Sequence, residues 1–240
     1  LETETLAACR GVVVTSRFTR RRLVGLGVSE GRIRVVCPGT DPVSGDRAAA
    51  ASPPVLLTVG AVVPRKGHLE LARTLSRLVE LPWTWVCLGS LDWDPDYASA
   101  VCDVVDSGGL SSRVRWLGEC DDATVRGWYR RASLFVMPSH YEGYGMALAD
   151  AVAYGLPVVS TTGGAIPYTV PAAAAVLVPP GDEAALGTAL TSLLSAEGGE
   201  ARRIALAAAA RDEAAKLPSW GEMVRSFARA IEELAPDGAV

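Results

Sequence analysis

Hydrophobic and polar residues follow one another along this chain in blocks that are typical of a sheet covered by helices. From residue 55 onward, short apolar runs are separated by segments with helical periodicity. The apolar runs are continuous, as in parallel strands that are buried on both faces, so the pattern predicts an α/β, doubly wound, Rossmann-like sheet. The expected strands lie in VLLTVG (55–60), WTWVCLG (83–89), VRWLG (114–118), LFVMP (134–138), PVVS (157–160) and AAVLVPPGD (174–182).

Helices are expected between these strands and at both ends of the chain. Periodic segments predict helices over 68–80, 121–132 and 146–154, whereas DPDYASAVCDVVDSGG is interpreted only as a polar segment. Residues 1–41 have the order helix, strand, helix, strand, so they are interpreted as the tail of another α/β unit. Residues 42–54 have the composition of a linker, 55–216 form the main domain, and 217–240 contain a final amphipathic helix.

Composition narrows the class of protein. The chain has 240 residues, 49% of them hydrophobic, which is sufficient for a large buried core. A net charge of −4 argues against a nucleic-acid partner. No apolar run approaches the roughly 18 residues that span a bilayer, and no leader-like segment opens the sequence. Five scattered cysteines suit free thiols in a reducing compartment, so a cytoplasmic location is expected.

The first chemically distinctive loop is GAVVPRKG (60–67), directly after the strand 55–59. Ligands of doubly wound sheets bind at the carboxyl ends of the strands, where this loop would lie. Gly60 permits close approach of the backbone, and Arg65 and Lys66 place two cations beside a helix amino terminus. The loop therefore predicts a site for a diphosphate, with a solvated basic turn as the alternative.

The second distinctive loop is HYEGYGMALAD (140–150), which follows the apolar run LFVMP. Gly143 and Gly145 flank Tyr144 just before the helix that begins near Met146, so successive backbone N–H groups would face an anion. Carboxylates are good acceptors for paired hydroxyl groups, and this loop carries Glu142, with Asp150 one turn into the helix. A site with cations, N–H donors and two carboxylates fits a sugar nucleotide.

These pieces resemble the carboxyl-terminal, donor-binding half of the retaining GT-B glycosyltransferases of family 4, also called group 1. The segments VGAVVPRKG, FVMPSHYEGYGMALADAVAYGLPVVSTTGG and AAVLVPPGD occur in the family's order and spacing. The resemblance implies that Arg65 and Lys66 bind the diphosphate and that Glu142 contacts the donor sugar. It also implies that the backbone of Tyr144, Gly145 and Met146 reaches the sugar and phosphate.

The resemblance extends to further positions and includes two departures. Asp150 stands where the family has a glutamate that binds the ribose, and Tyr168 stands where the family often has an acid. The loop that contacts the base is expected after Gly118, near Glu119 and Cys120. Residues 1–41 are similar to the end of the family's acceptor-binding domain, and CPGTDP is similar to the interdomain crossing, so most of that domain is expected to lie outside this sequence. The resemblance also implies that the final helix, within 217–240, crosses back toward that domain.

The resemblance implies a hexosyltransferase-type activity on a nucleoside-diphosphate sugar, with retention of configuration, in polysaccharide or glycolipid synthesis. The catalytic residues would be Arg65, Lys66 and Glu142, with Gly60, Glu119, Gly143, Tyr144, Gly145, Met146 and Asp150 in donor binding. No cofactor and no metal are expected, because Asp92 and Asp94 are not interpreted as a metal site. A UDP- or GDP-sugar is expected rather than an ADP-sugar, and peripheral contact with the inner face of the membrane stays open.

Other classes of function remain as alternatives. A non-catalytic nucleotide-sugar-binding module or degenerate subunit is favoured by Asp150, by Tyr168 and by the expected absence of most of the acceptor-binding domain. Under the enzyme interpretation, an inactive fragment of the transferase is the alternative for this chain alone. A related epimerase or phosphorylase is a weaker alternative, because Lys66 and Lys216 are the two lysines and neither has the setting of a pyridoxal phosphate lysine. An NAD-binding domain is weaker still, since GLGVSEG (25–31) follows a helix instead of a strand.

A few remaining residues carry expectations of their own. His68 is expected to be an exposed residue at a helix start, and His140 is a candidate for lining the sugar pocket. The six tryptophans are expected mostly to pack in the core. The arginines at positions 17, 20, 21 and 22 are interpreted as a solvated helix face, with binding of an acidic lipid or phosphorylated acceptor as the alternative.

Overall fold

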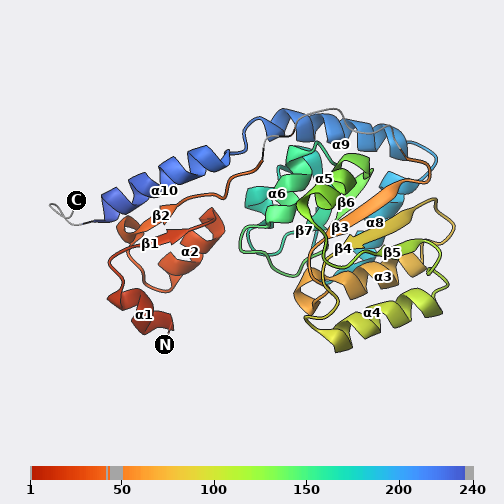
Figure 1. Ribbon diagram of the computed structural model, residues 1–240, viewed down its shortest axis with the longest axis horizontal. Helices are drawn as coiled ribbons and strands as arrows, with labels where there is room; N and C mark the ends of the chain where they lie inside the picture. Colours follow the sequence, from red (N-terminus) through yellow and green to blue (C-terminus); the bar gives the residue numbers. More distant parts are fainter. Residues whose placement is uncertain (1, 42, 44–50, 236–240) are drawn as a thin grey trace.

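The computed structural model describes residues 2–41, 43 and 51–235, which form a large α/β unit, a small α/β unit and a long helix that connects back to the small one (Figure 1). Most of the stretch 42–54, predicted as a linker, lies outside the described residues. Within the described part of the chain, no helix has both the length and the apolar character that crossing a membrane requires.

The large unit is built on a six-stranded parallel sheet with the order β5-β4-β3-β6-β7-β8. The chain starts in the middle of the sheet, moves outward to β5 and then returns to the other side of β3. Every neighbouring pair is parallel, with Leu56 opposite Trp85 in β4 and opposite Leu134 in β6. The strands are β3 (Val55–Val59), β4 (Thr84–Leu88), β5 (Val114–Trp116), β6 (Leu134–Val136), β7 (Val158–Thr161) and β8 (Ala175–Val178).

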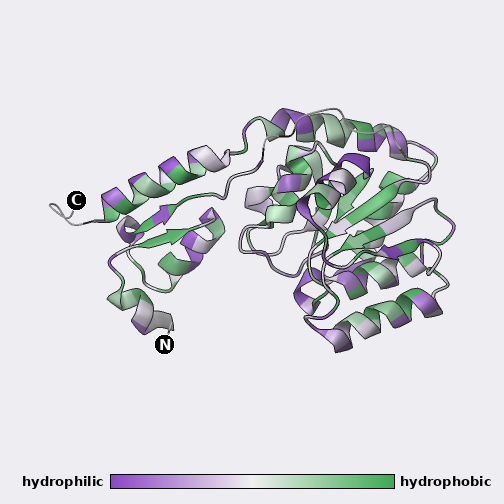
Figure 2. Cartoon of the chain, in the orientation of Figure 1, coloured by the Kyte–Doolittle hydropathy of each residue, from purple (hydrophilic) through white to green (hydrophobic). Residues whose placement is uncertain are grey.

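Helices cover both faces of this sheet, as the continuous apolar strands predict. Neighbouring residues of β3 point to opposite sides: Leu56 belongs to the core under α3, α4 and α8, and Leu57 to the core under α5 and α6. Figure 2 shows the strands as predominantly apolar and the helices as mixed. The helices are α3 (His68–Ser76), α4 (Pro95–Ser107), α5 (Asp122–Arg131), α6 (Met146–Ala153), α7 (Ile166–Thr169), α8 (Glu183–Leu194) and α9 (Gly199–Ala214), with the 3-10 turns η2 (Pro64–Lys66) and η3 (Ala172–Ala174).

Helix α4 forms in the segment that the sequence analysis interprets only as polar. Asp94 caps its amino terminus by accepting a hydrogen bond from the backbone N–H of Tyr97, and Pro95 occupies the first turn. Ala98, Val101 and Val105 are buried along one face. Helix formation here follows from the cap and from this narrow apolar stripe, which the surrounding aspartates obscure in the sequence.

The small unit is a two-stranded parallel sheet with helices at its side. β1 (Val12–Val14) pairs with β2 (Ile33–Val35), and the elements around them are α1 (Glu2–Ala8), α2 (Arg17–Gly25) and η1 (Glu30–Arg32). Val14, Leu23, Val28 and Ile33 form its small buried core. The observed order of helix and strand agrees with the order expected for residues 1–41.

Helix α10 (Trp220–Leu234) extends from the large unit along the small one (Figure 1). At its start, an isolated parallel bridge joins Thr40 to Ser219. Near its end, Arg34 of β2 forms an ion pair of 2.6 Å with Glu233. The chain therefore passes from the small unit to the large unit once and returns to the small unit through α10.

Candidate functional site

The sheet reverses its winding direction between β3 and β6. These two strands are neighbours in the sheet, although β4 and β5 lie between them in the chain and 74 residues separate the end of β3 from the start of β6. In doubly wound sheets the crevice beyond the carboxyl ends of two such strands is the usual ligand site. The loop after β3 is GAVVPRKG and the loop after β6 contains the segment 137–145. The two loops that carry Arg65, Lys66 and Glu142 therefore meet at the switch point.

The loop after β3 brings Lys66 back over the end of its own strand. Gly60 has φ 151°, and a Cβ atom on it would lie 3.3 Å from Lys66 Cε. Gly67 ends the turn η2 in the left-handed conformation, with φ 74°, and a Cβ atom there would lie 2.3 Å from the carbonyl oxygen of Pro138. Only glycine at 67 allows the loop to approach the backbone after β6 this closely.

The loop after β6 presents Glu142 as a buried carboxylate. Its Oε1 accepts a hydrogen bond of 2.7 Å from Lys66 Nζ and one of 2.8 Å from Ser139 Oγ, and its Oε2 lies 3.0 Å from Arg65 Nη1. The Lys66 side chain is 13% exposed and that of Arg65 is 47% exposed. One carboxylate thus pairs with both cations, and the Arg65 side chain is the more solvent-exposed of the two.

Two glycines after β7 hold the Glu142 turn in place. The backbone N–H of Ala165 donates to the carbonyl oxygen of Glu142 at 2.8 Å. A Cβ atom at Gly163 would lie 2.3 Å from the carbonyl oxygen of His140, and one at Gly164 would lie 2.4 Å from that of Glu142. The segment TTGG therefore forms the third wall of the site, a role that the sequence analysis did not assign to it.

Helix α6 begins directly after this turn. Gly145 adopts the left-handed conformation with φ 93°, and no side chain from the described residues caps the helix amino terminus. Gly143 and Tyr144 precede it and Met146, which is 46% exposed, follows. The donor-binding roles predicted for these backbone groups remain predictions.

Asp150 of α6 lines a separate, smaller cavity. A cavity of about 130 Å³ is lined by Asp41, Asp122, Val125, Arg126, Tyr129, Asp150 and Tyr154. Burial, followed by the negative charge of Asp41, raises the pKa of Asp150 to about 6. Burial, followed by Cys37 and Asp150, raises the pKa of Tyr144 to about 12. The structure therefore does not bring Asp150 into contact with the Lys66–Glu142 pair.

A larger cavity of about 460 Å³ lies over the ends of β3, β4 and β5. It is lined by Val59, Gly60, Ala61, Leu88, Gly89, Ser90, Trp93, Glu119, Cys120 and Val125. Gly60 connects this cavity to Lys66, and Val125 also lines the hollow that holds Asp150. Gly60 and Glu119, two of the residues predicted to bind the donor, thus share one cavity.

The two histidines lie in different environments, and the expected exposure of His68 is wrong. His68 is completely buried, not exposed, and burial followed by the charge of Lys66 lowers its pKa to about 3. It packs against Trp85 with ring centroids 6.4 Å apart, so it is a neutral core residue. His140 turns toward α3, where its Nε2 lies 2.7 Å from Glu70 Oε1.

Tyr168 faces the small unit. Its hydroxyl oxygen accepts a hydrogen bond of 2.6 Å from Arg21 Nη1, and the Arg21 guanidinium also lies 5.4 Å from the centre of the Tyr168 ring. Phe18 of α2 makes an edge-on contact with Tyr141, with ring centroids 5.8 Å apart. Within the basic cluster of α2, Arg21 therefore contacts the large unit, and Arg20 pairs with Glu30 at 2.8 Å.

No group of three or more His, Cys, Asp or Glu residues suited to a metal ion occurs in the part of the chain that the structure describes. Glu142, the carboxylate at the switch point, is paired with Lys66 and Arg65. Metal independence remains a prediction, since it concerns the reaction.

The large unit is a doubly wound, Rossmann-like parallel sheet, with paired cations and a carboxylate at its switch point. Its structural neighbours place this fold in the GT-B class. Sucrose-phosphate synthase from Thermosynechococcus elongatus matches it with a TM-score of 0.84 and 25% identity, over 97% of this chain and 60% of that protein. Anabaena HepE, solved with UDP and glucose, matches with a TM-score of 0.80 and 17% identity, over 97% of this chain and 68% of HepE.

Sequence comparison places the chain within a family. The family model for glycosyl transferases group 1 matches residues 53–196, so the chain belongs to the glycosyl transferases group 1 family. A D-inositol 3-phosphate glycosyltransferase from Xylanimonas cellulosilytica is 31% identical over 92% of this chain and 56% of the relative. One from Catenulispora acidiphila is 30% identical over 93% of this chain and 57% of the relative. The chain thus spans little more than half the length of these relatives.

Besides the TTGG segment, two further residues at the candidate site were missed by the sequence analysis. Ser139 is fully buried and donates to Glu142, but a serine after a strand carries no distinctive signal. Trp93 was grouped with the core tryptophans, yet it is 75% exposed and lines the larger cavity. Its neighbours Asp92, Asp94 and Pro95 were a usable signal, because a tryptophan within a polar turn has little core to enter.

Proposed function

We propose that this chain is the donor-binding part of a retaining glycosyltransferase of family 4 that transfers a hexose from a nucleoside-diphosphate sugar. The observation that carries the proposal is the cluster formed by Arg65, Lys66 and Glu142 at the switch point of the sheet. Two cations beside a helix start are suited to a diphosphate, and a carboxylate between them is suited to the hydroxyl groups of a sugar.

The positions of the surrounding residues support one orientation of the donor. The diphosphate lies against Arg65 and Lys66, the sugar lies toward Glu142 and the start of α6, and the base lies in the cavity that contains Glu119. Asp150 lies beside that cavity through the shared residue Val125, a position suited to the ribose hydroxyls. HepE, whose structures include UDP and UDP-glucose complexes, supports a nucleotide sugar as the ligand class.

The proposed reaction exchanges one bond at the anomeric carbon of the sugar. The bond from this carbon to the diphosphate oxygen breaks, and a bond to the acceptor hydroxyl oxygen forms on the same face. The departing diphosphate takes the acceptor's proton, and Arg65 and Lys66 stabilise the negative charge that develops on it. Glu142 supports the positive charge on the ring, and no protein nucleophile is involved.

Several features of the complete protein belong to this proposal. The acceptor binds in an amino-terminal domain of which the small unit is the end, and the product is a polysaccharide or glycolipid. The protein works in the cytoplasm, and the exposed arginines of α2 are suited to peripheral contact with acidic lipids at the inner face of the membrane. A UDP- or GDP-sugar is the proposed donor.

No metal takes part in the proposed reaction, so the rate of sugar transfer should be unchanged in EDTA. A loss of transfer that magnesium restores would contradict this prediction.

The decisive experiment is calorimetric titration of the chain with UDP, GDP and ADP without added metal. One of the three should bind, and Arg65→Ala should weaken its binding by roughly 2–3 kcal/mol, or about 30- to 150-fold, because a charge-assisted contact to the diphosphate is lost. Arg73→Ala is the matched control, since this arginine of α3 pairs with Glu183. An affinity that is unchanged in Arg65→Ala would contradict the placement of the site.

A non-catalytic nucleotide-sugar-binding module is the second candidate. It is favoured by Tyr168, which stands where the family often has an acid and bonds to Arg21. Asp150, which is one methylene shorter than the family's glutamate, also favours this alternative. Under this alternative, Asp150→Glu should tighten donor binding strongly; under the leading proposal it should change little.

A further inference from the structure

The cavity over β3, β4 and β5 has a rigid floor made of three neighbouring loops. The backbone N–H of Gly60 donates to the carbonyl oxygen of Leu88 at 2.7 Å, and that of Gly89 donates to the carbonyl oxygen of Gly118 at 2.8 Å. Gly89 has φ 146°, and a Cβ atom on it would lie 2.0 Å from the carbonyl oxygen of Gly60. The loops are therefore locked together at van der Waals distance, and the cavity is a preformed feature.

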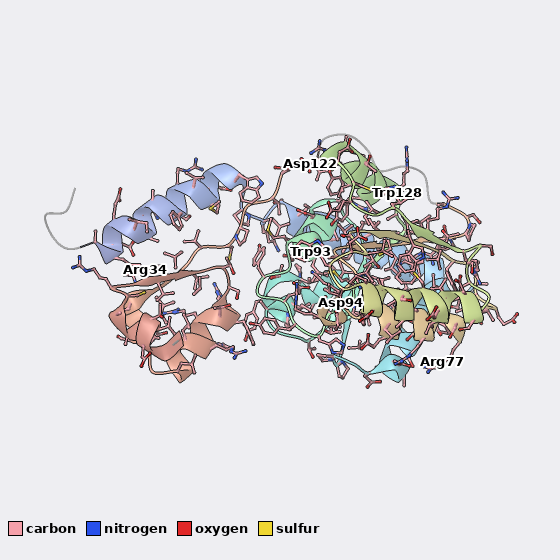
Figure 3. All side chains as sticks on the ribbon, turned by 60° about the horizontal axis from the view of Figure 1, so that its bottom comes forward. Arg34, Arg77, Trp93, Asp94, Asp122 and Trp128 are labelled. Carbon is pink, nitrogen blue, oxygen red and sulfur yellow. The ribbon has the colours of Figure 1, made fainter. Side chains whose placement is uncertain are left out.

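Trp93 is an exposed aromatic residue at this cavity. Its side chain is 75% exposed, whereas Trp83 and Trp85 are completely buried. Figure 3 labels Trp93 beside Asp94, in the loop between β4 and α4. An indole in water leaves a large apolar surface uncovered, and an aromatic side chain that lines a cavity is suited to contact with a ligand.

The loop that carries Trp93 is anchored on both sides. The backbone N–H of Asp92 donates to Ser90 Oγ at 3.0 Å, and Asp94 caps α4. Tyr97, in the first turn of α4, accepts a hydrogen bond of 3.0 Å at its hydroxyl oxygen from the backbone N–H of Leu69. Because the turn is held at both ends, the exposure of the indole is a property of the fold.

The charges around the cavity give it a direction. Lys66 lies against Gly60 at one end of the cavity. The lining residues Trp93, Glu119 and Cys120 carry no positive charge. An anionic group is favoured at the Lys66 end, and a flat, uncharged ring with polar edges is favoured at the other. A nucleoside diphosphate has this order of chemical groups.

We infer that Trp93 stacks on the nucleobase of the donor and so contributes to donor affinity. The inference rests on the proposed function, and it adds a residue of the β4–α4 loop to the site. Stacking on an aromatic side chain accepts any base, because every base has a π-face. Trp93 would therefore contribute to affinity, while discrimination between bases would fall to the polar groups at the cavity edge.

Calorimetry with two kinds of probe tests this inference. UDP, GDP and ADP carry a base, whereas inorganic pyrophosphate offers only the anionic part. Trp93→Ala should weaken binding of the preferred nucleotide by about 5- to 150-fold, the range corresponding to roughly 1–3 kcal/mol per stacked base. Pyrophosphate binding should be unchanged, and Trp93→Phe, which keeps an aromatic face, should retain most of the nucleotide affinity.

Trp220→Ala is the matched control, because Trp220 is a partly exposed tryptophan of α10. Trp220→Ala should leave the affinities for the nucleotide and for pyrophosphate unchanged. The nucleotide should quench the tryptophan fluorescence of Trp220→Ala but not that of Trp93→Phe. Equal nucleotide affinity in wild type and Trp93→Ala would overturn the inference alone, as would an equal loss of pyrophosphate binding. If the wild type binds none of the three nucleotides, the proposed function fails and the inference falls with it.

Discussion

At the residue scale, the single carboxylate of Glu142 holds two cations at 2.7 and 3.0 Å. This arrangement predefines the positions of Lys66 and Arg65, so little side-chain entropy remains to be lost when an anion binds. It also has a cost, since the same carboxylate repels a diphosphate that approaches the two cations. Glu142 should therefore affect a bare nucleotide and a sugar nucleotide in opposite directions.

We predict that Glu142→Gln binds the preferred nucleoside diphosphate more tightly, by about fivefold, because roughly 1 kcal/mol of repulsion is removed. The additional affinity for the corresponding sugar nucleotide should fall, because the acceptor for the sugar hydroxyls is weakened. Calorimetric titration with both ligands measures the two effects. Glu70→Gln is the control, since Glu70 pairs with His140. A parallel loss of both affinities would contradict the prediction.

Asp150 provides a second prediction at this scale, because its pKa is raised to about 6 by burial and by Asp41. In the unfolded chain an aspartate titrates near 3.9, so between these values the folded state binds the extra proton and stability falls as pH rises. Above pH 6, ionised Asp150 is expected to lower the free energy of unfolding by about 1–3 kcal/mol. Asp150→Asn removes this charge.

Asp150→Asn should therefore be more stable than wild type at pH 7.5 by about 1–3 kcal/mol, and this advantage should shrink as pH falls toward 4. The same variant should bind nucleotide more weakly, because an ionised acceptor for the ribose is lost. Urea denaturation at the two pH values measures the first effect. An equal stability difference at both pH values would exclude titration of Asp150 as its cause.

At the element scale, the site depends on how closely the turn after β3 approaches the backbone after β6. Gly67 carries this contact, because it has φ 74° and its α-carbon faces the carbonyl oxygen of Pro138. Gly127 in α5 offers a matched contrast, since a methyl group there would meet open space among the residues that the structure describes.

We predict that Gly67→Ala lowers the free energy of unfolding by at least about 1–3 kcal/mol, because strained backbone and a steric clash are combined. Gly127→Ala should instead raise it by about 0.5–1 kcal/mol, through the better helix propensity of alanine. Urea denaturation compares the two variants directly. The prediction fails if the two substitutions shift stability in the same direction and by similar amounts.

At the scale of the whole molecule, α10 carries one apolar face that is only partly covered. Near the end of the helix, Ala230 is buried and Leu234 lies against Gly11 of the small unit. Toward the start of the helix the same face continues as an apolar stripe at the spacing of successive helical turns, formed by Trp220, Val224, Phe227 and Ile231, which are 40–59% exposed. An uncovered stripe of this length is expected to bind apolar surfaces.

We predict that the chain binds a hydrophobic fluorescent dye through this stripe and that Phe227→Gln removes much of the signal. Ile204→Gln is the matched control, because Ile204 of α9 is 60% exposed and lies outside the stripe. Both substitutions should change the free energy of unfolding by less than about 0.5 kcal/mol, since neither side chain is buried. Equal dye fluorescence for the two variants would contradict a role for α10.

The elements of the large unit could be predicted well from the sequence, and the contacts of the site only in part. Arg65, Lys66 and Glu142 could be selected from the sequence because their residue types are distinctive and lie shortly after apolar strands, and the structure brings the three side chains together. The direct pairing of Lys66 with Glu142 was not predicted, because pairing across 76 positions depends on which strands are neighbours. His68 was placed at a helix start correctly, but its burial was not, since one polar residue carries no sign of which helix face is covered.

The sequence by itself determined the doubly wound class, the two loops that carry charge and the glycines that allow tight turns, because each depends on local composition and periodicity. The tertiary structure decided which loops meet, that Asp150 lies in its own hollow, that Trp93 is exposed at a cavity and that Tyr168 bonds to Arg21. These features depend on strand order and on the approach of separate units. Both arise from burial of surface summed over the whole chain, so no short segment encodes them.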